Sequence, residues 1–264
     1  MTNPISHCFK NTEKKLVTFI TGGDPNFETS LKIIKILIKN KVDIIEIGMP
    51  FSDPMADGPT IQLSSKRAID QNIKLNDIFN LSREAKKIKA DLPIILMGYY
   101  NLILHFGINN FVNKCKENGV DGLIIVDLQP EEDSDLINEL AKKDIKLIRL
   151  ITPTTNEERL KLILKNASGF LYYVSVMGIT GQKSANLDEL KKSVEFIKKH
   201  TNLPILPGFG IKNPVDVNNI CKVADGAVVG SSIIKIVEDN LDDRDNMILQ
   251  IDTFTKQLKE GTKI

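Results

Sequence analysis

Residues 16–48 read LVTFITGGDPNFETSLKIIKILIKNKVDIIEIG, and this stretch carries a complete strand–helix–strand pattern. The apolar run 16–21 predicts a strand that ends at the Gly-Gly-Asp-Pro turn, and residues 27–39 place apolar side chains at helical spacing. Residues 44–48 predict a second strand. Because both strands are nearly continuous apolar runs, they are typical of a parallel sheet that helices cover.

The same alternation continues along the rest of the chain. Further strands are predicted at 93–97, 122–126, 146–151, 170–174, 203–207 and 226–230, and helices at 61–70, 76–89, 108–117, 131–143, 156–164, 187–199 and 214–221, with two more helical segments at the end. About eight βα units without a long polar linker favour an α/β fold of one domain, residues 1–264, in the form of a closed (β/α)8 TIM barrel. Residues 6–10 predict an extra N-terminal helix that covers the bottom of the barrel. An open doubly wound sheet is the alternative, although no GxGxxG motif opens the first helix.

Composition narrows the class of protein. The chain has 35 Lys and Arg against 34 Asp and Glu, which argues against a nucleic-acid or anionic-membrane partner. Cys8, Cys115 and Cys221 are isolated, so we expect neither a disulfide nor a metal site. The start of the chain lacks the apolar core of a signal peptide, and the apolar runs are too short to span a bilayer. We therefore expect a cytoplasmic protein.

Two acids mark a candidate active site. Glu46 lies within the apolar strand 44–48, and Asp57 lies on the Pro-rich loop that follows it. A buried carboxyl is costly unless it is paired or protonated, so Glu46 and the nearby Asp57 indicate two carboxylates that divide acid–base work. The alternatives are a salt bridge from Glu46 to a helix lysine, and a simple turn role for Asp57 before Gly58.

The loops near the end of the chain indicate a phosphate site. Residues 208–210 and 230–232 follow the predicted strands 203–207 and 226–230, the seventh and eighth, and they read GFG and GSS. In TIM barrels these two loops often hold a phosphate with backbone N–H groups and a helix N-terminus, and Ser231 or Ser232 would also cap that helix. Residues 175–185 predict a lid over the site. The alternatives are tight turns for the glycines and a plain surface loop for 175–185.

Several motifs together resemble one known family. Residues 46–62, EIGMPFSDPMADGPTIQ, are the most specific, and residues 97–101, Tyr172 with 175–181, 208–211 and 230–231 support them. Over nearly its whole length the chain resembles the tryptophan synthase alpha subunit. The resemblance implies retro-aldol cleavage of indole-3-glycerol phosphate to indole and glyceraldehyde 3-phosphate. It also implies no cofactor in this chain and a pyridoxal-phosphate-dependent beta subunit as the partner, in an alpha2beta2 heterotetramer.

The resemblance also implies residue roles. Glu46 would transfer the proton, and Asp57 would accept the indole N–H bond. The remaining residues would contact substrate: Phe19 and Phe209 as apolar walls, Tyr172 near the glycerol, Thr180 beside Asp57, and Gly181, Gly210, Gly230 and Ser231 on the phosphate. Core packing is the alternative role for the three aromatic residues. The chain departs from the usual pattern at Gly98, Leu102 and Gln129, in loops on the side where the family meets its beta partner.

Two other functions stay open at this point. One is a stand-alone lyase that uses the same site and releases free indole. The other is an inactive homologue that only binds or activates a partner, and the presence of both Glu46 and Asp57 argues against it.

Overall fold

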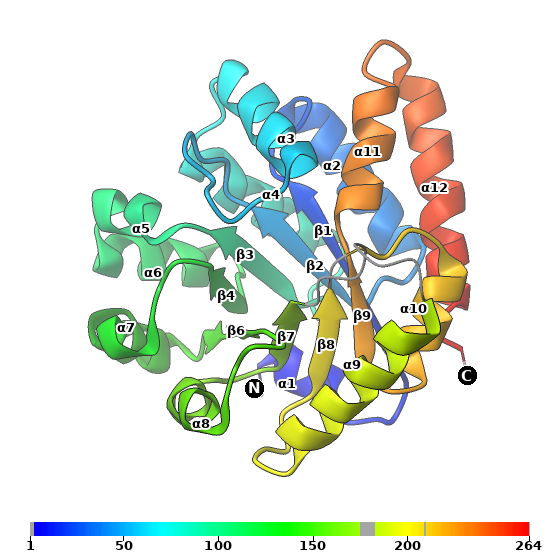
Figure 1. Cartoon of the computed structure of the whole chain (residues 1–264). Coiled ribbons are helices and arrows are strands. Elements are labelled where there is room, and N and C mark those ends of the chain that lie inside the picture. Colours follow the sequence, from blue (N-terminus) through cyan, green and yellow to red (C-terminus); the bar gives the residue numbers. More distant parts are fainter. Residues whose placement is uncertain (1–2, 175–182, 209, 264) are drawn as a thin grey trace.

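A parallel sheet forms the centre of the molecule (Figure 1). The computed structural model describes residues 3–174, 183–208 and 210–263, with the backbone alone for 183–186. Its strands are β1 Lys15–Thr21, β2 Ile44–Gly48, β3 Ile94–Gly98, β4 Gly122–Ile125, β5 Lys146–Leu147, β6 Arg149–Ile151, β7 Leu171–Val174, β8 Ile205–Gly208 and β9 Gly226–Val229. Their order in the sheet is β5-β4-β3-β2-β1-β9-β8-β7-β6.

The two edge strands of this sheet are consecutive in the chain. β5 and β6 are parts of the predicted strand 146–151, and only Ile148 separates them. β5 pairs with β4, and Ile148 N still donates to Leu123 O on that side at 2.9 Å, whereas β6 pairs with β7. The sheet therefore returns on itself as a nearly closed barrel. This confirms the predicted (β/α)8 fold, with the fifth strand divided at the closure, and rules out the open sheet.

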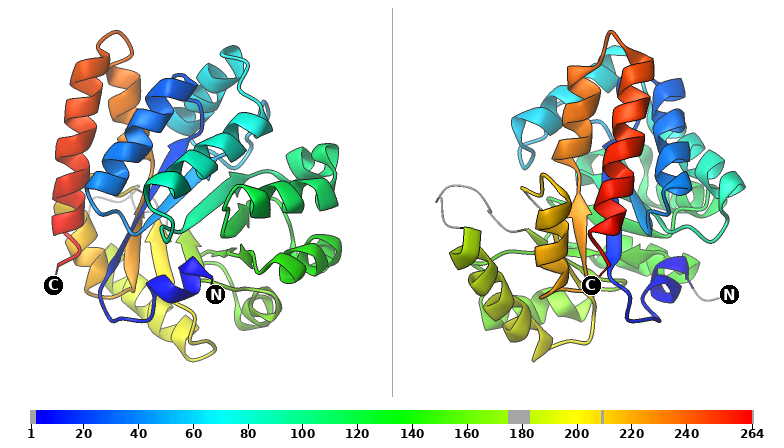
Figure 2. Two further views of the ribbon diagram at one scale, coloured as in Figure 1. Left: turned by 180° about the vertical axis from the view of Figure 1, so that it is seen from behind. Right: turned by 90° about the vertical axis from the view of Figure 1, so that its right-hand side faces the viewer.

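Helices surround the barrel (Figures 1 and 2). They are α1 Pro4–Cys8, α2 Phe27–Lys39, α3 Pro59–Asp70, α4 Leu75–Ile88, α5 Tyr100–Phe106, α6 Ile108–Glu117, α7 Ser134–Lys143, α8 Glu157–Lys165, α9 Lys183–Lys198, α10 Pro214–Cys221, α11 Ser231–Asp239 and α12 Arg244–Glu260, with a 3-10 turn at Pro130–Glu132. The sequence does not predict α5, because its seven residues make only two turns and show little periodicity. In the part of the chain that the structure describes, no helix has the length and hydropathy of a bilayer span.

Alternate residues of the strands fill the barrel. Buried apolar side chains from the strands form an interior cluster: Val17, Ile44, Ile95, Ile124, Ile148, Leu206 and Val228, with Phe170 and with Ile5 of α1. Ile5 is fully buried, so α1 closes this end as predicted, although the helix begins two residues earlier than expected. Side chains alternate along a strand, so the residue two positions after each interior residue also faces the interior. These residues lie nearer the C-terminal ends of the strands and are Phe19, Glu46, Met97 and Tyr172.

Candidate functional site

Glu46 is a fully buried acid. It lies on β2 with 0% of its surface exposed, and among the described residues neither carboxyl oxygen has a hydrogen-bond partner. The alternative of a salt bridge from Glu46 to a helix lysine is therefore not supported, because no lysine of the described residues binds it. Burial raises the pKa of Glu46 to about 8, because a charged carboxylate would lose its hydration there. The carboxyl is therefore mostly protonated near neutral pH and can donate a proton.

Asp57 is held in place by Tyr99, which follows β3. The Tyr99 hydroxyl donates to Asp57 Oδ2 at 3.0 Å and accepts a bond from Ala56 N at 3.0 Å. The Tyr99 ring stacks on Phe51, with 5.0 Å between ring centroids. Three residues of the loop after β2 thus contact one tyrosine. Burial raises the pKa of Asp57, and the hydrogen bond from Tyr99 opposes that rise by stabilising the carboxylate.

Sequence reasoning gives Tyr99 no role, although residues 97–101 contribute to the resemblance. Its position directly after the last residue of β3 is the available signal, because catalytic residues of these barrels gather at strand C-terminal ends. Tyr99 and Tyr100 are adjacent, and the sequence does not tell which of them faces Asp57. In the structure Tyr100 is the first residue of α5, and Tyr99 precedes the helix and binds Asp57.

Asp57 lines a small recess, of about 290 Å³ when the open space at its mouth is included. The lining is otherwise mostly apolar and comes from Phe19, Thr21, Gly48, Met49, Ile61, Ser65, Met97, Gly98, Tyr99 and Val126. Gly48 leaves room for Phe19, since a Cβ there would lie 2.6 Å from the ring Cζ atom. Gly98 likewise leaves room for Met49, since a Cβ there would lie 2.8 Å from Met49 Cε. The lining has the chemistry that a flat apolar ring with one N–H donor requires, apolar side chains and a single carboxylate, whereas the space free in this conformation is about that of one water molecule. Glu46 does not line the recess.

Tyr172 is a third buried titratable group of the barrel interior. It lies on β7, inside the barrel, and its ring passes over Gly208, where any Cβ would overlap the hydroxyl. Burial raises the pKa of Tyr172, and the negative charges of Glu46 and Asp57 raise it further. Tyr172 thus lies within electrostatic range of both predicted catalytic acids.

The predicted phosphate loops meet at the start of α11. Gly210 has a φ of +71°, and the Ser232 hydroxyl donates to Ile211 O at 2.6 Å, which ties the loop after β8 to the loop after β9. The prediction that Ser231 or Ser232 caps the helix is wrong. The cap position falls one residue earlier, at Gly230, which has no side chain for this role. The first N–H groups of α11 thus lack a side-chain cap and suit an anion.

Three predicted substrate contacts, Thr180, Gly181 and Phe209, lie outside the described residues. All three cysteines are free thiols. Across residues 3–174, 183–208 and 210–263, no group of three or more His, Cys, Asp or Glu side chains could hold a metal ion.

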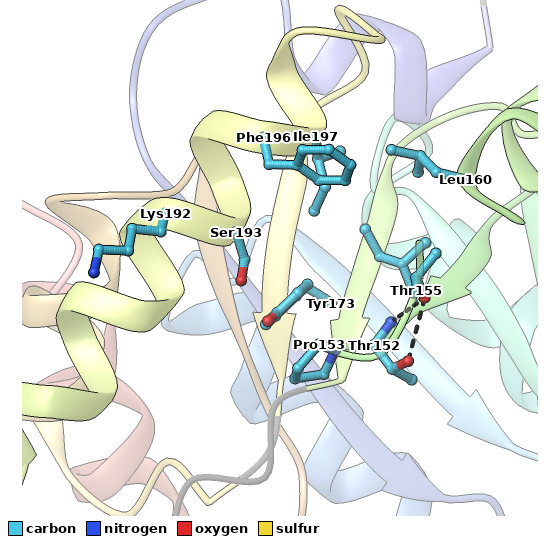
Figure 3. Close-up of a pocket in the computed structure, with 10 residues that line it drawn as sticks. Thr152, Pro153, Thr155, Leu160, Tyr173, Lys192, Ser193, Phe196 and Ile197 are labelled. Atoms are coloured by element: carbon cyan, nitrogen blue, oxygen red, sulfur yellow. Dashed lines mark hydrogen bonds between the residues drawn. The ribbon is translucent and has the colours of Figure 1, made fainter. Parts of the chain in front are cut away.

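A second cavity lies away from these residues (Figure 3). It measures about 520 Å³ and is lined from the ends of β6 and β7 and from α8 and α9, with Tyr173, Ser193 and Phe196 on its wall. Tyr173 faces away from the barrel interior that Tyr172 occupies, because neighbouring strand residues point to opposite faces. The cavity contains none of the predicted site residues.

The fold and the site are those of a barrel enzyme. Glu46, Asp57 and the start of α11 all lie towards the C-terminal ends of the strands, where the active sites of such barrels are found. The family model described as "Tryptophan synthase alpha chain" matches residues 5–263. The chain therefore belongs to the tryptophan synthase alpha chain family.

Comparisons with individual relatives support the same family assignment. A tryptophan synthase alpha chain of Petrotoga mobilis is 45% identical over 255 residues, which cover 97% of this chain and 98% of the relative. The crystal structure of tryptophan synthase subunit alpha from Legionella pneumophila is 34% identical, with a TM-score of 0.92 over 99% of both chains. A structure from Aquifex aeolicus is 36% identical, with a TM-score of 0.88 over 99% of both chains.

Family membership establishes the reaction. The tryptophan synthase alpha chain is a lyase that cleaves indole-3-glycerol phosphate, and it acts as a subunit beside a beta chain. The alpha chain needs no cofactor of its own, because pyridoxal phosphate belongs to the beta subunit. The subunit function is thus supported over the stand-alone lyase and the inactive homologue.

Proposed function

We propose that Glu46 and Asp57 divide the cleavage of indole-3-glycerol phosphate between them. The observation that carries this proposal is that Glu46 is fully buried and has no hydrogen-bond partner among the described residues, and its pKa of about 8 keeps a proton available near neutral pH. Burial raises the pKa of Asp57 too, but Asp57 is less buried than Glu46 and the Tyr99 hydroxyl stabilises its charged form, which opposes the rise. Two carboxyls with contrasting environments are the pattern expected when one donates a proton and the other stays charged.

The chemistry follows from these states. The Glu46 carboxyl donates its proton to C3 of the indole ring, which makes the ring cationic, and Asp57 accepts the N–H bond of that cation. The Glu46 carboxylate then takes the proton of the C3′ hydroxyl. The bond between C3 and C3′ breaks, its electron pair returns to the indole ring, and C3′ becomes the aldehyde of glyceraldehyde 3-phosphate. Glu46 ends the cycle protonated again.

The remaining contacts position the two halves of the substrate. Phe19 and the apolar recess beside Asp57 would hold the indole ring, and Tyr172 would lie near the glycerol. Backbone N–H groups would bind the phosphate: those of Gly230 and Ser231 at the start of α11, where the cap residue is a glycine, and that of Gly210 in the loop after β8. Thr180, Gly181 and Phe209 complete the predicted set of contacts.

We also propose that residues 1–264 form one domain and that the protein acts in the cytoplasm, where a reducing environment suits its three free thiols. Indole would pass to the beta subunit of an alpha2beta2 assembly, and strong activation of cleavage by an added beta subunit is the expected result. Full activity without that subunit would favour a stand-alone lyase instead.

The direct test is indole release from indole-3-glycerol phosphate. Glu46→Gln and Asp57→Asn should each lose most of the cleavage activity, by a factor of about 100 or more. Both should still bind glycerol phosphate, which shares the phosphate contacts. Asp53→Asn is the matched control, because Asp53 is an exposed acid on the same loop and does not line the recess. Wild-type activity in either test variant would remove that acid from the mechanism.

A further inference from the structure

Helix α3 carries one wall of the candidate site. It begins at Pro59, two residues after Asp57, and its first turns add Ile61 and Ser65 to the lining of the recess. The start of α3 has no side-chain cap, and a Cβ on Gly58 would meet nothing within 4 Å. In the first turn Gln62 Nε2 donates to Asp57 O at 2.8 Å, which ties the loop to α3, and the contacts of α3 with the barrel include side chains further along the helix.

Two side chains of α3 bind the last residue of β1 and the loop that follows it. Arg67 donates to both carboxylate oxygens of Asp24, from Nε at 2.7 Å and from Nη2 at 2.9 Å. The hydroxyl groups of Ser64 and Thr21 share a hydrogen bond of 2.6 Å. We call Thr21, Asp24, Ser64 and Arg67 the α3 anchor.

Hydrogen bonds also tie Asp24 to the start of α2. Asp24 is 2% exposed, and the Ser30 hydroxyl of α2 donates to Asp24 O while it accepts a bond from Gly23 N. Burial raises the pKa of Asp24, and the hydrogen bonds and positive charge of Arg67 oppose that rise by stabilising the carboxylate. A two-bond fork fixes the orientation of its partner as well as its distance, which a single ammonium cannot do.

We propose that the α3 anchor positions Asp57 for the reaction by fixing the place and rotation of α3. The proposal rests on the role of Asp57 given above. Arg67 and Asp24 act through the backbone between Arg67 and Asp57 and do not touch the substrate. A misplacement of about 1 Å at a reacting group can lower a rate by about 100-fold, so a loosened α3 should slow cleavage.

The test replaces the fork while it keeps the charge. Arg67→Lys should lower kcat for indole release by about 10- to 100-fold with little change in KM, because the phosphate contacts lie on other loops. Ser64→Ala, a milder change that removes the bond to Thr21, should lower kcat in the same direction. The matched control is Lys86→Met, which breaks the similarly buried Lys86–Asp121 pair at the other end of the barrel. The control should lower the melting temperature and leave kcat unchanged.

A merely structural role gives a different result. If Arg67→Lys and Ser64→Ala lower the melting temperature like the control while kcat stays at the wild-type value, the proposal is overturned. A double-mutant cycle adds a second criterion. If the anchor acts through Asp57, Arg67→Lys should cost much less in an Asp57→Asn background than in the wild type. Equal costs in both backgrounds would also overturn it.

Failure of this inference and failure of the proposed function can be told apart. If Asp57→Asn retains wild-type kcat, the role of Asp57 is wrong and the inference fails with it. If Asp57→Asn loses activity and Arg67→Lys does not, Asp57 keeps its role and only the anchor loses its part in positioning.

Discussion

Glu46→Gln should destroy activity and stabilise the protein. Glutamine has nearly the shape of the protonated glutamate, so it fits the same buried place on β2, but it has no proton to donate. The stability gain arises because the folded state holds Glu46 neutral, with a pKa of about 8 against an ordinary value of 4.5. An acid with a raised pKa in the folded state binds more protons there than in the unfolded chain, so stability falls as pH rises between those two values.

The size of the gain follows from the two pKa values. Below pH 4.5 both states hold the proton, and the glutamate has no pH-dependent cost. At a cost of about 1.4 kcal/mol per pH step, the glutamate lowers the free energy of unfolding, relative to glutamine, by about 1 kcal/mol at pH 5, about 3 at pH 7 and about 4 at pH 8. Above the folded pKa the difference levels off.

Urea denaturation of both proteins at pH 5, 7 and 8 measures this difference. The chain has no tryptophan, so far-UV circular dichroism is the suitable signal. The predicted observation is a gap that widens with pH in favour of the glutamine variant, together with loss of indole release. A gap that stays constant from pH 5 to pH 8 would refute the reasoning, because it would mean that Glu46 ionises in the folded protein as it does in the unfolded chain.

Two further changes test the neighbours of the acids. Tyr99→Phe removes the hydrogen bond that stabilises charged Asp57, so activity should fall about 10-fold. The pKa of Asp57 should rise, and the acid limb of the kcat/KM pH profile should therefore move to higher pH. An acid limb at the wild-type pH would count against this role of Tyr99. Gly208→Ala places a Cβ on the Tyr172 hydroxyl and should lower indole release, whereas Gly58→Ala has open space and should retain it. Equal activity of the two alanine variants, compared at matched stability, would show that the position of Tyr172 is unimportant.

The sequence predicted the regular elements well where the pattern was long. Helix 27–39 and strand 44–48 agree with α2 and β2 to the residue, because their periodicity is strong and clear turn residues bound them. Helix 187–199 was placed too late, since α9 begins at Lys183 in a stretch of small polar residues with weak periodicity. The division of strand 146–151 at Ile148 was not predictable, because it reflects the closure of the barrel and no local sequence preference.

The sequence alone determined the order of strands and helices, and it placed Glu46 within an apolar strand and Asp57 on the loop behind it. Those features depend on residues close together in the chain, which local patterns record. Only the tertiary structure decided that Glu46 has no partner among the described residues, that Tyr99 binds Asp57 across 42 positions, and that Arg67 binds Asp24 across 43. Such contacts depend on how distant elements pack around the barrel, and the same packing sets the pKa values on which the proposed chemistry depends.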